Sequence, residues 1–154
     1  MNAIRVAVLK ACSIRKNRII KNVEKEALYT VSLNEENNSP AYRLGRLFAL
    51  LEKVQAAAIP GANATIRDRY FGAASATPAS VFPLILRLSR HHISKAEGYG
   101  IWIDRKIQSV MSGLDHFPSH LNLEEQGLFI LGYYHQRQAL FTKSEPENNE
   151  NEKG

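Results

Sequence analysis

The amino-acid sequence predicts an all-α fold, a single bundle of about five or six helices over residues 1–143 with a disordered acidic tail over residues 144–154. Three observations indicate this class. Apolar residues recur at spacings of three and four in several segments, as in helices with one buried face. Serine, threonine or asparagine stands where several of these segments begin, as expected of helix caps. No segment shows the apolar–polar alternation of a half-buried strand, and no internal repeat is visible.

The charge of the chain is unevenly distributed. The 154 residues carry a formal net charge of +5, but residues 1–143 hold 19 Lys and Arg against 11 Asp and Glu, which gives +8. Residues 144–154 hold one Lys against four Glu, which gives −3. A basic folded part favours nucleic acid or an acidic surface as the partner, and a merely solvated basic face is the alternative.

The composition also indicates the cellular compartment of the protein. The single cysteine, Cys12, excludes an internal disulfide framework and suits a reducing environment. The apolar residues at positions 6–9 are too few for a signal peptide, and no run approaches the roughly 18 apolar residues of a membrane span. We therefore expect a soluble cytoplasmic protein.

The first predicted helix covers residues 3–17. Its apolar face would contain Ile4, Ala7, Val8, Ala11 and Ile14. Six bases and no acid lie between Arg5 and Lys21, which could form a solvated face or contact phosphate. Residues 22–38 are less regular and permit one further short helix before a polar loop at 33–39.

The clearest amphipathic pattern follows this loop. Ser39 is a plausible N-cap and Pro40 fits the first helical position, so a helix should run from there to about residue 58. Pro60-Gly61 ends it. The apolar stripe of this helix is Leu44, Leu47, Phe48, Leu51, Val54 and Ala58, and Arg46 and Lys53 share the opposite face.

The stretch over residues 63–92 joins bases and aromatic residues to a second proline-bearing helix. Residues 65–70 predict one or two helical turns, residues 72–76 a small-residue loop, and Thr77-Pro78 another cap. Pro83 allows a short turn followed by a helix over 83–96, or one kinked helix. In both, one side is apolar (Val81, Leu84, Ile85, Leu88, His92), and a narrow opposite strip contains Arg87, Arg90 and Ser94.

Two more helices are predicted near the C-terminus. Gly98 and Gly100 should break the chain before a helix whose buried stripe is Ile103, Ile107, Val110, Met111 and Leu114. A loop around Pro118 follows. Asn122 with Glu125 resembles a capping box and starts the last helix, about 123–142.

The last helix is apolar on two sides, which predicts burial between neighbours or an interface. One side contains Leu123, Gly127, Ile130, Leu131, Tyr134 and Phe141, and the other contains Phe129, Tyr133 and Leu140. Gly127 and Gly132 each lower helix propensity by roughly 1 kcal/mol, so we expect close backbone packing at both.

Metal and catalytic sites are not expected, and neither is a cofactor. His91 and His92 are adjacent and point about 100° apart on a helix, and His92 should be a core residue. His116 and His120 flank Pro118 and lack the glutamate of a zinc-binding helix. Cys12 is expected to be a small buried side chain, and Asp68 an ion-pair partner of the flanking arginines.

Nucleic-acid binding is the best-supported class of function. Single strands are held by basic grooves with aromatic or arginine platforms, and phosphates also by hydroxyls and helix N-termini. Residues 74–80 offer such hydroxyls and backbone donors, although Phe71 and Thr77 are better interpreted as structural. The predicted contact residues are Arg67, Arg69, Arg87, Arg90, Arg15, Lys16, Arg18, Arg46 and Lys53, with Tyr70 as a possible platform.

Three long strings also carry a resemblance. They are AYRLGRLFALLEKVQ (41–55), ATIRDRYFGAASATPASVFPLILRLSRHH (64–92) and LEEQGLFILGYYHQRQALF (123–141). These strings resemble the C-terminal region of the large subunit of the type I-C CRISPR Cascade complex. The resemblance covers most of residues 41–142, is loose over 1–38 and does not reach the tail.

The resemblance implies a role in an assembly. In this family the C-terminal region is also made separately, from an internal start, as the small subunit, and this chain, which begins with Met1, resembles that product. It would be present in several copies beside the large and backbone subunits of the crRNA-guided complex. There it would stabilise the R-loop through the displaced non-target strand and the heteroduplex backbone, while guide–target pairing reads sequence. No catalytic residue is implied, because a separate nuclease-helicase cuts DNA.

Two other hypotheses remain open. The chain could be a purely structural module whose last helix joins subunits through Phe129, Tyr133 and Leu140, with its bases only balancing acidic neighbours. A stand-alone helix-turn-helix regulator is the third hypothesis, which Pro83 and the long loops disfavour.

Overall fold

A computed structural model describes residues 32–142 of the chain, and the structural statements that follow concern these residues. The helix predicted over 3–17 and the acidic tail lie outside them. The described helices are α2 (Pro40–Ala58), α3 (Ile66–Ala76), α4 (Pro78–Lys95), α5 (Glu97–Met111) and α6 (Leu123–Phe141). No strand occurs in this part of the chain, which confirms the all-α prediction. None of these helices is long and apolar enough to span a membrane.

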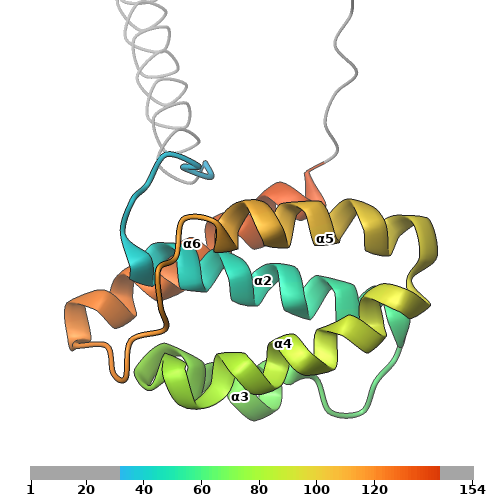
Figure 1. Cartoon of the computed structure of the whole chain (residues 1–154), viewed down its shortest axis with the longest axis horizontal. Helices are drawn as coiled ribbons and strands as arrows, with labels where there is room; N and C mark the ends of the chain where they lie inside the picture. Colours follow the sequence, from blue (N-terminus) through green and yellow to red (C-terminus); the bar gives the residue numbers. More distant parts are fainter. Residues whose placement is uncertain (1–31, 143–154) are drawn as a thin grey trace, which may run out of the picture. The chain divides into compact units, whose positions relative to one another are not determined.

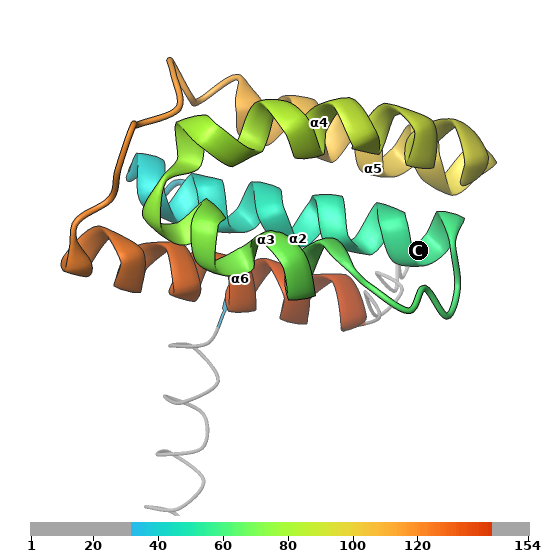
Figure 2. The same ribbon diagram turned by 90° about the horizontal axis from the view of Figure 1, so that it is seen from below.

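Helix α2 lies at the centre of the bundle. It contacts each of the other four described helices, most extensively α6. Figure 2 shows α2 between the α4–α5 pair and α6, and Figure 1 shows α2 flanked by α4 and α5. Ser39 accepts a hydrogen bond from the Tyr42 amide and Pro40 follows it, as predicted. All but one of the residues from Ala41 to Leu51 are buried, so α2 is enclosed well beyond its predicted stripe.

Helices α2 and α6 approach each other at two glycines. A Cβ atom on Gly45 would clash with the backbone of Phe129 and Tyr133, and one on Gly132 would clash with the backbone of Tyr42. These clashes are with main-chain atoms, which cannot turn away as a flexible side chain can. The predicted close packing is confirmed at Gly132, but Gly127 faces open space.

Polar side chains tie α2 to α6 beside the glycine contact. The Tyr133 hydroxyl donates a hydrogen bond to the Glu52 carboxylate. Burial and this carboxylate together raise the pKa of Tyr133 well above its usual range, so the phenol remains a donor. Tyr42 Oη and His135 Nδ1 are 2.8 Å apart and share a second hydrogen bond. These bonds set the register of the two helices, because each partner lies at one position along its helix.

Aromatic rings fill the core between α2, α3, α4 and α6. Phe48 of α2 lies at the centre, with edge-to-face contacts to four rings whose centroids are 5.5–6.4 Å away. These rings belong to Phe71, Phe82, Phe129 and Tyr133. Such edge-to-face pairs are favoured by the ring quadrupoles. Phe71 therefore packs against the core, as predicted.

Helix α3 is longer than predicted. Residues 72–76 continue the helix rather than forming a small-residue loop, and only Thr77 separates α3 from α4. Alanine favours helix, and Ala74 is fully buried. The Thr77 hydroxyl donates to the Ala73 carbonyl, so it completes the end of α3 and makes no side-chain cap for α4.

Helix α4 is one continuous helix from Pro78 to Lys95 with Pro83 inside it. This settles the two interpretations of Pro83 in favour of a single helix. Proline lacks the amide hydrogen that would bond to the carbonyl one turn back, here that of Ala79. Both Ala79 and Pro83 are exposed, so water can bond to this carbonyl instead.

The predicted break at Gly98 and Gly100 was wrong by a few residues. Helix α4 ends at Lys95, and α5 begins at Glu97, whose φ of 50° lies in the left-handed region and turns the chain. Gly98 and Gly100 are both helical. A Cβ on Gly100 would clash with the Ile93 carbonyl, so this glycine permits the tight α4–α5 hairpin instead of ending a helix.

Helix α6 begins as predicted. The Asn122 side chain accepts from the Glu125 amide at 2.9 Å, and the Glu125 carboxylate accepts from the Asn122 amide at 2.8 Å. This is a complete capping box. The loop before it, around Pro118, is anchored because the Pro118 carbonyl accepts from the Ala79 amide of α4.

Substituting the contact glycines should therefore destabilise the fold. Gly45→Ala or Gly132→Ala should each lower the free energy of unfolding by about 1–3 kcal/mol or more, because the helices must separate to admit a methyl group. The matched control is Gly127→Ala, which meets open space and should raise stability by up to about 1 kcal/mol. Urea unfolding of the full chain measures all three, and equal effects of the three changes would contradict the close approach.

Candidate nucleic-acid interface

Helix α4 presents a basic exposed face. Its buried residues recur at helical spacing toward α2 and α5, which leaves the predicted strip in solvent. Arg87, Arg90 and Ser94 are all exposed, and His91 and Lys95 are exposed beside them. We call these five residues the α4 basic face. Within residues 32–142, neither Arg87 nor Arg90 forms an ion pair or a side-chain hydrogen bond.

No acid interrupts this part of the chain. Residues 69–96 contain four Lys and Arg and no Asp or Glu. Burial lowers the pKa of His92, and the neighbouring charges of His91 and Lys95 lower it further. His92 is 8% exposed, which confirms the prediction that it belongs to the core. The positive charge of α4 at neutral pH therefore resides on its exposed arginines and lysine.

The two arginines of α3 differ in their surroundings. Arg67 is partly buried and donates to the Tyr134 hydroxyl at 3.3 Å, with its guanidinium 5.5 Å from the centre of the Tyr133 ring. It thereby links α3 to α6. Arg69 is exposed. Arg69 is thus better placed than Arg67 to meet a ligand in solvent.

Asp68 does not have the predicted role. Its carboxylate accepts hydrogen bonds from the Thr65 amide at 3.1 Å and the Thr65 hydroxyl at 2.8 Å, completing a capping box at the start of α3. These bonds lower its pKa more than the nearby charge of Arg67 does. The predicted ion pairing with Arg67 and Arg69 was therefore wrong as the main interaction, because helix capping takes the carboxylate.

The start of α4 is not the open anion site that residues 74–80 suggested. The Ala79 amide donates to the Pro118 carbonyl at 2.9 Å, and the Ser80 amide donates to the Thr77 carbonyl at 3.1 Å. Two of the backbone donors that would meet a phosphate already have partners. The sequence could not show this, because the Pro118 loop lies about 40 residues away along the chain.

Arg46 was expected on an exposed face of α2, and that expectation was wrong. Arg46 is buried, with 7% of the residue exposed. The guanidinium donates to the Gln136 side chain at 3.1 Å and lies 3.5 Å from the Glu35 carboxylate. Burial lowers the pKa of Arg46, an effect that Glu35 partly offsets. Arg46 thus joins α2 to α6 and to the preceding loop, and its burial disfavours contact with phosphate.

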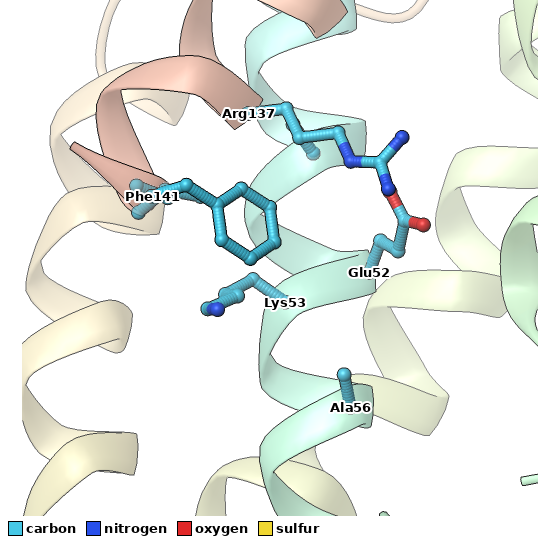
Figure 3. A pocket seen from close by; sticks show the side chains of 7 residues that line it. Glu52, Lys53, Ala56, Arg137 and Phe141 are labelled. Carbon is cyan, nitrogen blue, oxygen red and sulfur yellow. The ribbon is translucent and has the colours of Figure 1, made fainter. Parts of the chain in front are cut away.

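Lys53 lies in a groove between the ends of α2 and α6 (Figure 3). Its ammonium is 4.1 Å from the centre of the Phe141 ring. Figure 3 shows Arg137 and Glu52 pointing toward each other across the same groove. Lys53 therefore already has an aromatic partner, and its predicted contact with nucleic acid stays a prediction. Arg137 was not among the predicted residues, although its spacing of four from both Tyr133 and Phe141 could have indicated it.

The side of α6 that was predicted to join subunits faces the core of the bundle. Phe129 and Tyr133 are fully buried against α2 and α3, and Leu140 is partly buried. The other apolar side is exposed, with Leu123 at 85%. We call this side the α6 outer face. It consists of Leu123, Ile130, Leu131, Tyr134 and Phe141.

The remaining predicted site residues either pack against the core or lie outside the described residues. Arg15, Lys16 and Arg18 lie outside the described residues. Within residues 32–142 there is no cluster of three or more His, Cys, Asp or Glu side chains that could hold a metal ion. Tyr70 is partly buried and packs against the core. Among the predicted basic residues that the structure describes, Arg69, Arg87 and Arg90 are exposed.

The fold and the surface of the described residues define a class of protein, an all-α module with a basic helix face on α4, a helix that has no acids of its own, and an exposed apolar face on α6. The particular family follows from comparison with family models. The model of a CRISPR-associated protein family, Cas_Csd1, matches residues 1–141. The chain belongs to this family, which confirms the resemblance to a CRISPR-associated protein. The match includes residues 1–38, where the resemblance was loose. A search of curated proteins found no match.

The buried and exposed arginines should respond differently to truncation. Arg46→Ala leaves Gln136 without its buried partner and should lower the free energy of unfolding by about 1–3 kcal/mol. Arg69→Ala removes an exposed side chain and should change stability by no more than about 0.5 kcal/mol. Urea unfolding of both variants tests this difference. Equal stability of the two would show that Arg46 is not part of the α2–α6 contact.

Proposed function

We propose that this chain is a non-catalytic small subunit of a crRNA-guided type I-C Cascade complex in antiviral defence. It would act in the cytoplasm with the large subunit, the backbone subunits and further copies of itself. Its task would be to stabilise the R-loop by sequence-independent contacts with the displaced non-target strand and the heteroduplex backbone. Membership of a CRISPR-associated family supports the setting.

The α4 basic face is the observation that carries the nucleic-acid part of this proposal. Arg87 and Arg90 are one helical turn apart and both exposed. Arginine binds phosphate through several hydrogen bonds, and such contacts carry no sequence information. Ser94, one turn further on the same side, adds a hydroxyl that can also bond to phosphate. A face of this kind suits a partner whose sequence the protein does not have to read, because guide–target pairing reads the sequence.

The α6 outer face favours a second candidate, in which the chain bridges subunits without touching nucleic acid. Five large apolar side chains are exposed along this helix. Exposed apolar surface of this kind is typical of protein contact sites. A protein neighbour in the assembly would shield it from water. The two candidates use different helices, so they can be separated by substitution.

Loss of the two α4 arginines should weaken target binding. Complexes carrying Arg87→Ala with Arg90→Ala should bind target DNA less tightly at low salt. The slope of log affinity against log salt should fall by about 1 for each lost phosphate contact. Affinity of the purified complex for target duplex, measured over a salt series, gives both quantities.

The control for this experiment keeps the same change in net charge. Ser112→Glu with Ser119→Glu also adds two negative units, but at exposed positions outside α4. This variant should keep most of the wild-type salt slope. If the arginine variant retains the wild-type slope and affinity, then Arg87 and Arg90 do not contact phosphate.

A charge on the α6 outer face should impair assembly if this face binds a protein. Leu131→Glu places a carboxylate at the centre of an apolar contact, so the chain should copurify with the other subunits in reduced amount. Ser112→Glu adds the same charge at the exposed residue that follows α5 and should leave copurification intact. Full assembly of the Leu131 variant would exclude the bridging role for this face.

A further inference from the structure

Helix α5 carries an exposed aromatic pair that the nucleic-acid proposal above does not use. Tyr99 and Trp102 are 36% and 44% exposed, and their ring centroids are 5.4 Å apart with planes inclined by 35°. They lie on α5 three residues apart, so they are neighbours on its surface. Partial burial raises the pKa of Tyr99, which keeps its ring uncharged at neutral pH.

Positive charge accompanies the pair. The Lys106 ammonium is 5.0 Å from the centre of the Trp102 ring, and Arg105 is exposed one turn beyond Trp102. At about 100° per residue, Lys106 and Arg105 lie within about 60° of Trp102 around the helix axis. The two acids of α5, Glu97 and Asp104, lie about 140–160° away. The aromatic side of α5 is therefore basic and free of acids from its own helix.

The pair is also adjacent in the chain to the α4 basic face. That face ends at Lys95, and a single residue, Ala96, connects α4 to α5. Tyr99 follows in the first turn of α5. The end of α4 and the start of α5 meet at this hairpin (Figure 1). Lys95 at the end of α4 and Tyr99 at the start of α5 thus flank the same turn.

We propose that Tyr99 and Trp102 form a stacking platform for an unpaired base of single-stranded nucleic acid, with Lys106 and Arg105 beside its phosphates. This inference rests on the proposed nucleic-acid function and specifies that these residues bind the single-stranded form of the nucleic acid. Single-strand binding sites combine cations that follow the backbone with aromatic rings that stack bases. A base inside a duplex has both faces covered by its neighbours, so the platform selects unpaired nucleotides. Charge favours this occupant over an apolar protein surface, which would have to bury Lys106 and Arg105.

The single tryptophan of the chain makes the platform directly observable. Trp102 is the only tryptophan, so intrinsic tryptophan fluorescence reports on this position alone. The full chain is titrated at low salt with oligo-dT and oligo-U single strands of about 15 nucleotides, a length suited to one site. A duplex of the same length serves as the comparison, and the anisotropy of labelled strands measures binding independently of the tryptophan.

Binding of single strands should quench the fluorescence of Trp102, and addition of the duplex should not. Trp102→Ala should weaken single-strand binding roughly five- to a hundred-fold, the range that stacking of one base on a ring provides. It should leave duplex binding unchanged. Ile101→Ala is the matched control. Ile101 is also exposed on α5, but it is aliphatic and lies about 100° from Trp102 around the helix axis. Circular dichroism of both variants verifies the fold. The comparison of oligo-dT with oligo-U shows which nucleic acid is preferred.

Three results would overturn the inference. Single-strand binding with unchanged Trp102 fluorescence and unchanged affinity of Trp102→Ala would exclude the platform while leaving the proposed function intact. Absence of binding to every strand would count against both. Normal single-strand binding by Trp102→Ala, together with its failure to copurify with the other subunits, would make the pair a protein contact.

Discussion

The close approach of α2 and α6 at Gly45 and Gly132 is the constraint on which the rest of the bundle depends. Only glycine allows the two backbones to meet there, since a Cβ on either residue would overlap main-chain atoms of the other helix. The contact also brings Tyr133 to Glu52 and Arg46 to Gln136. Phe48 then lies against the aromatic rings of α3, α4 and α6, so the core follows from the helix contact.

This contact also decides which surfaces remain available. It directs one apolar side of α6 inward, so Phe129 and Tyr133 become core residues and the α6 outer face is left exposed. It also draws Arg46 into the interface and so removes a base from the surface. On α4 the packing has the opposite effect, because its apolar residues face the bundle and Arg87 and Arg90 remain in water. The molecule therefore has a basic face and an apolar face on different helices.

Much of the fold follows from local patterns. The bounds of α2 and α6 agree with their predicted caps, since Ser39-Pro40 and the Asn122–Glu125 capping box are determined within a few residues. Two of the errors occur where contact with another helix or loop decides the outcome. Gly100 accommodates the Ile93 carbonyl instead of ending a helix, and the Ala79 amide is taken by the Pro118 loop. Asp68 was misassigned for a local reason, because the same carboxylate can serve a capping box or an ion pair, and the capping box with Thr65 takes it.

The sequence by itself determined the helical class, most helix boundaries, the family resemblance and the basic strip of α4, because each depends on nearest neighbours or on strings of consecutive residues. The tertiary structure alone decided which apolar side of α6 is buried, which arginines stay in solvent and which glycine is a contact. These depend on where two remote helices cross. A wheel of α6 shows two apolar sides of similar character, and only the position of Gly45 opposite Gly132 distinguishes the side that packs from the side that faces water.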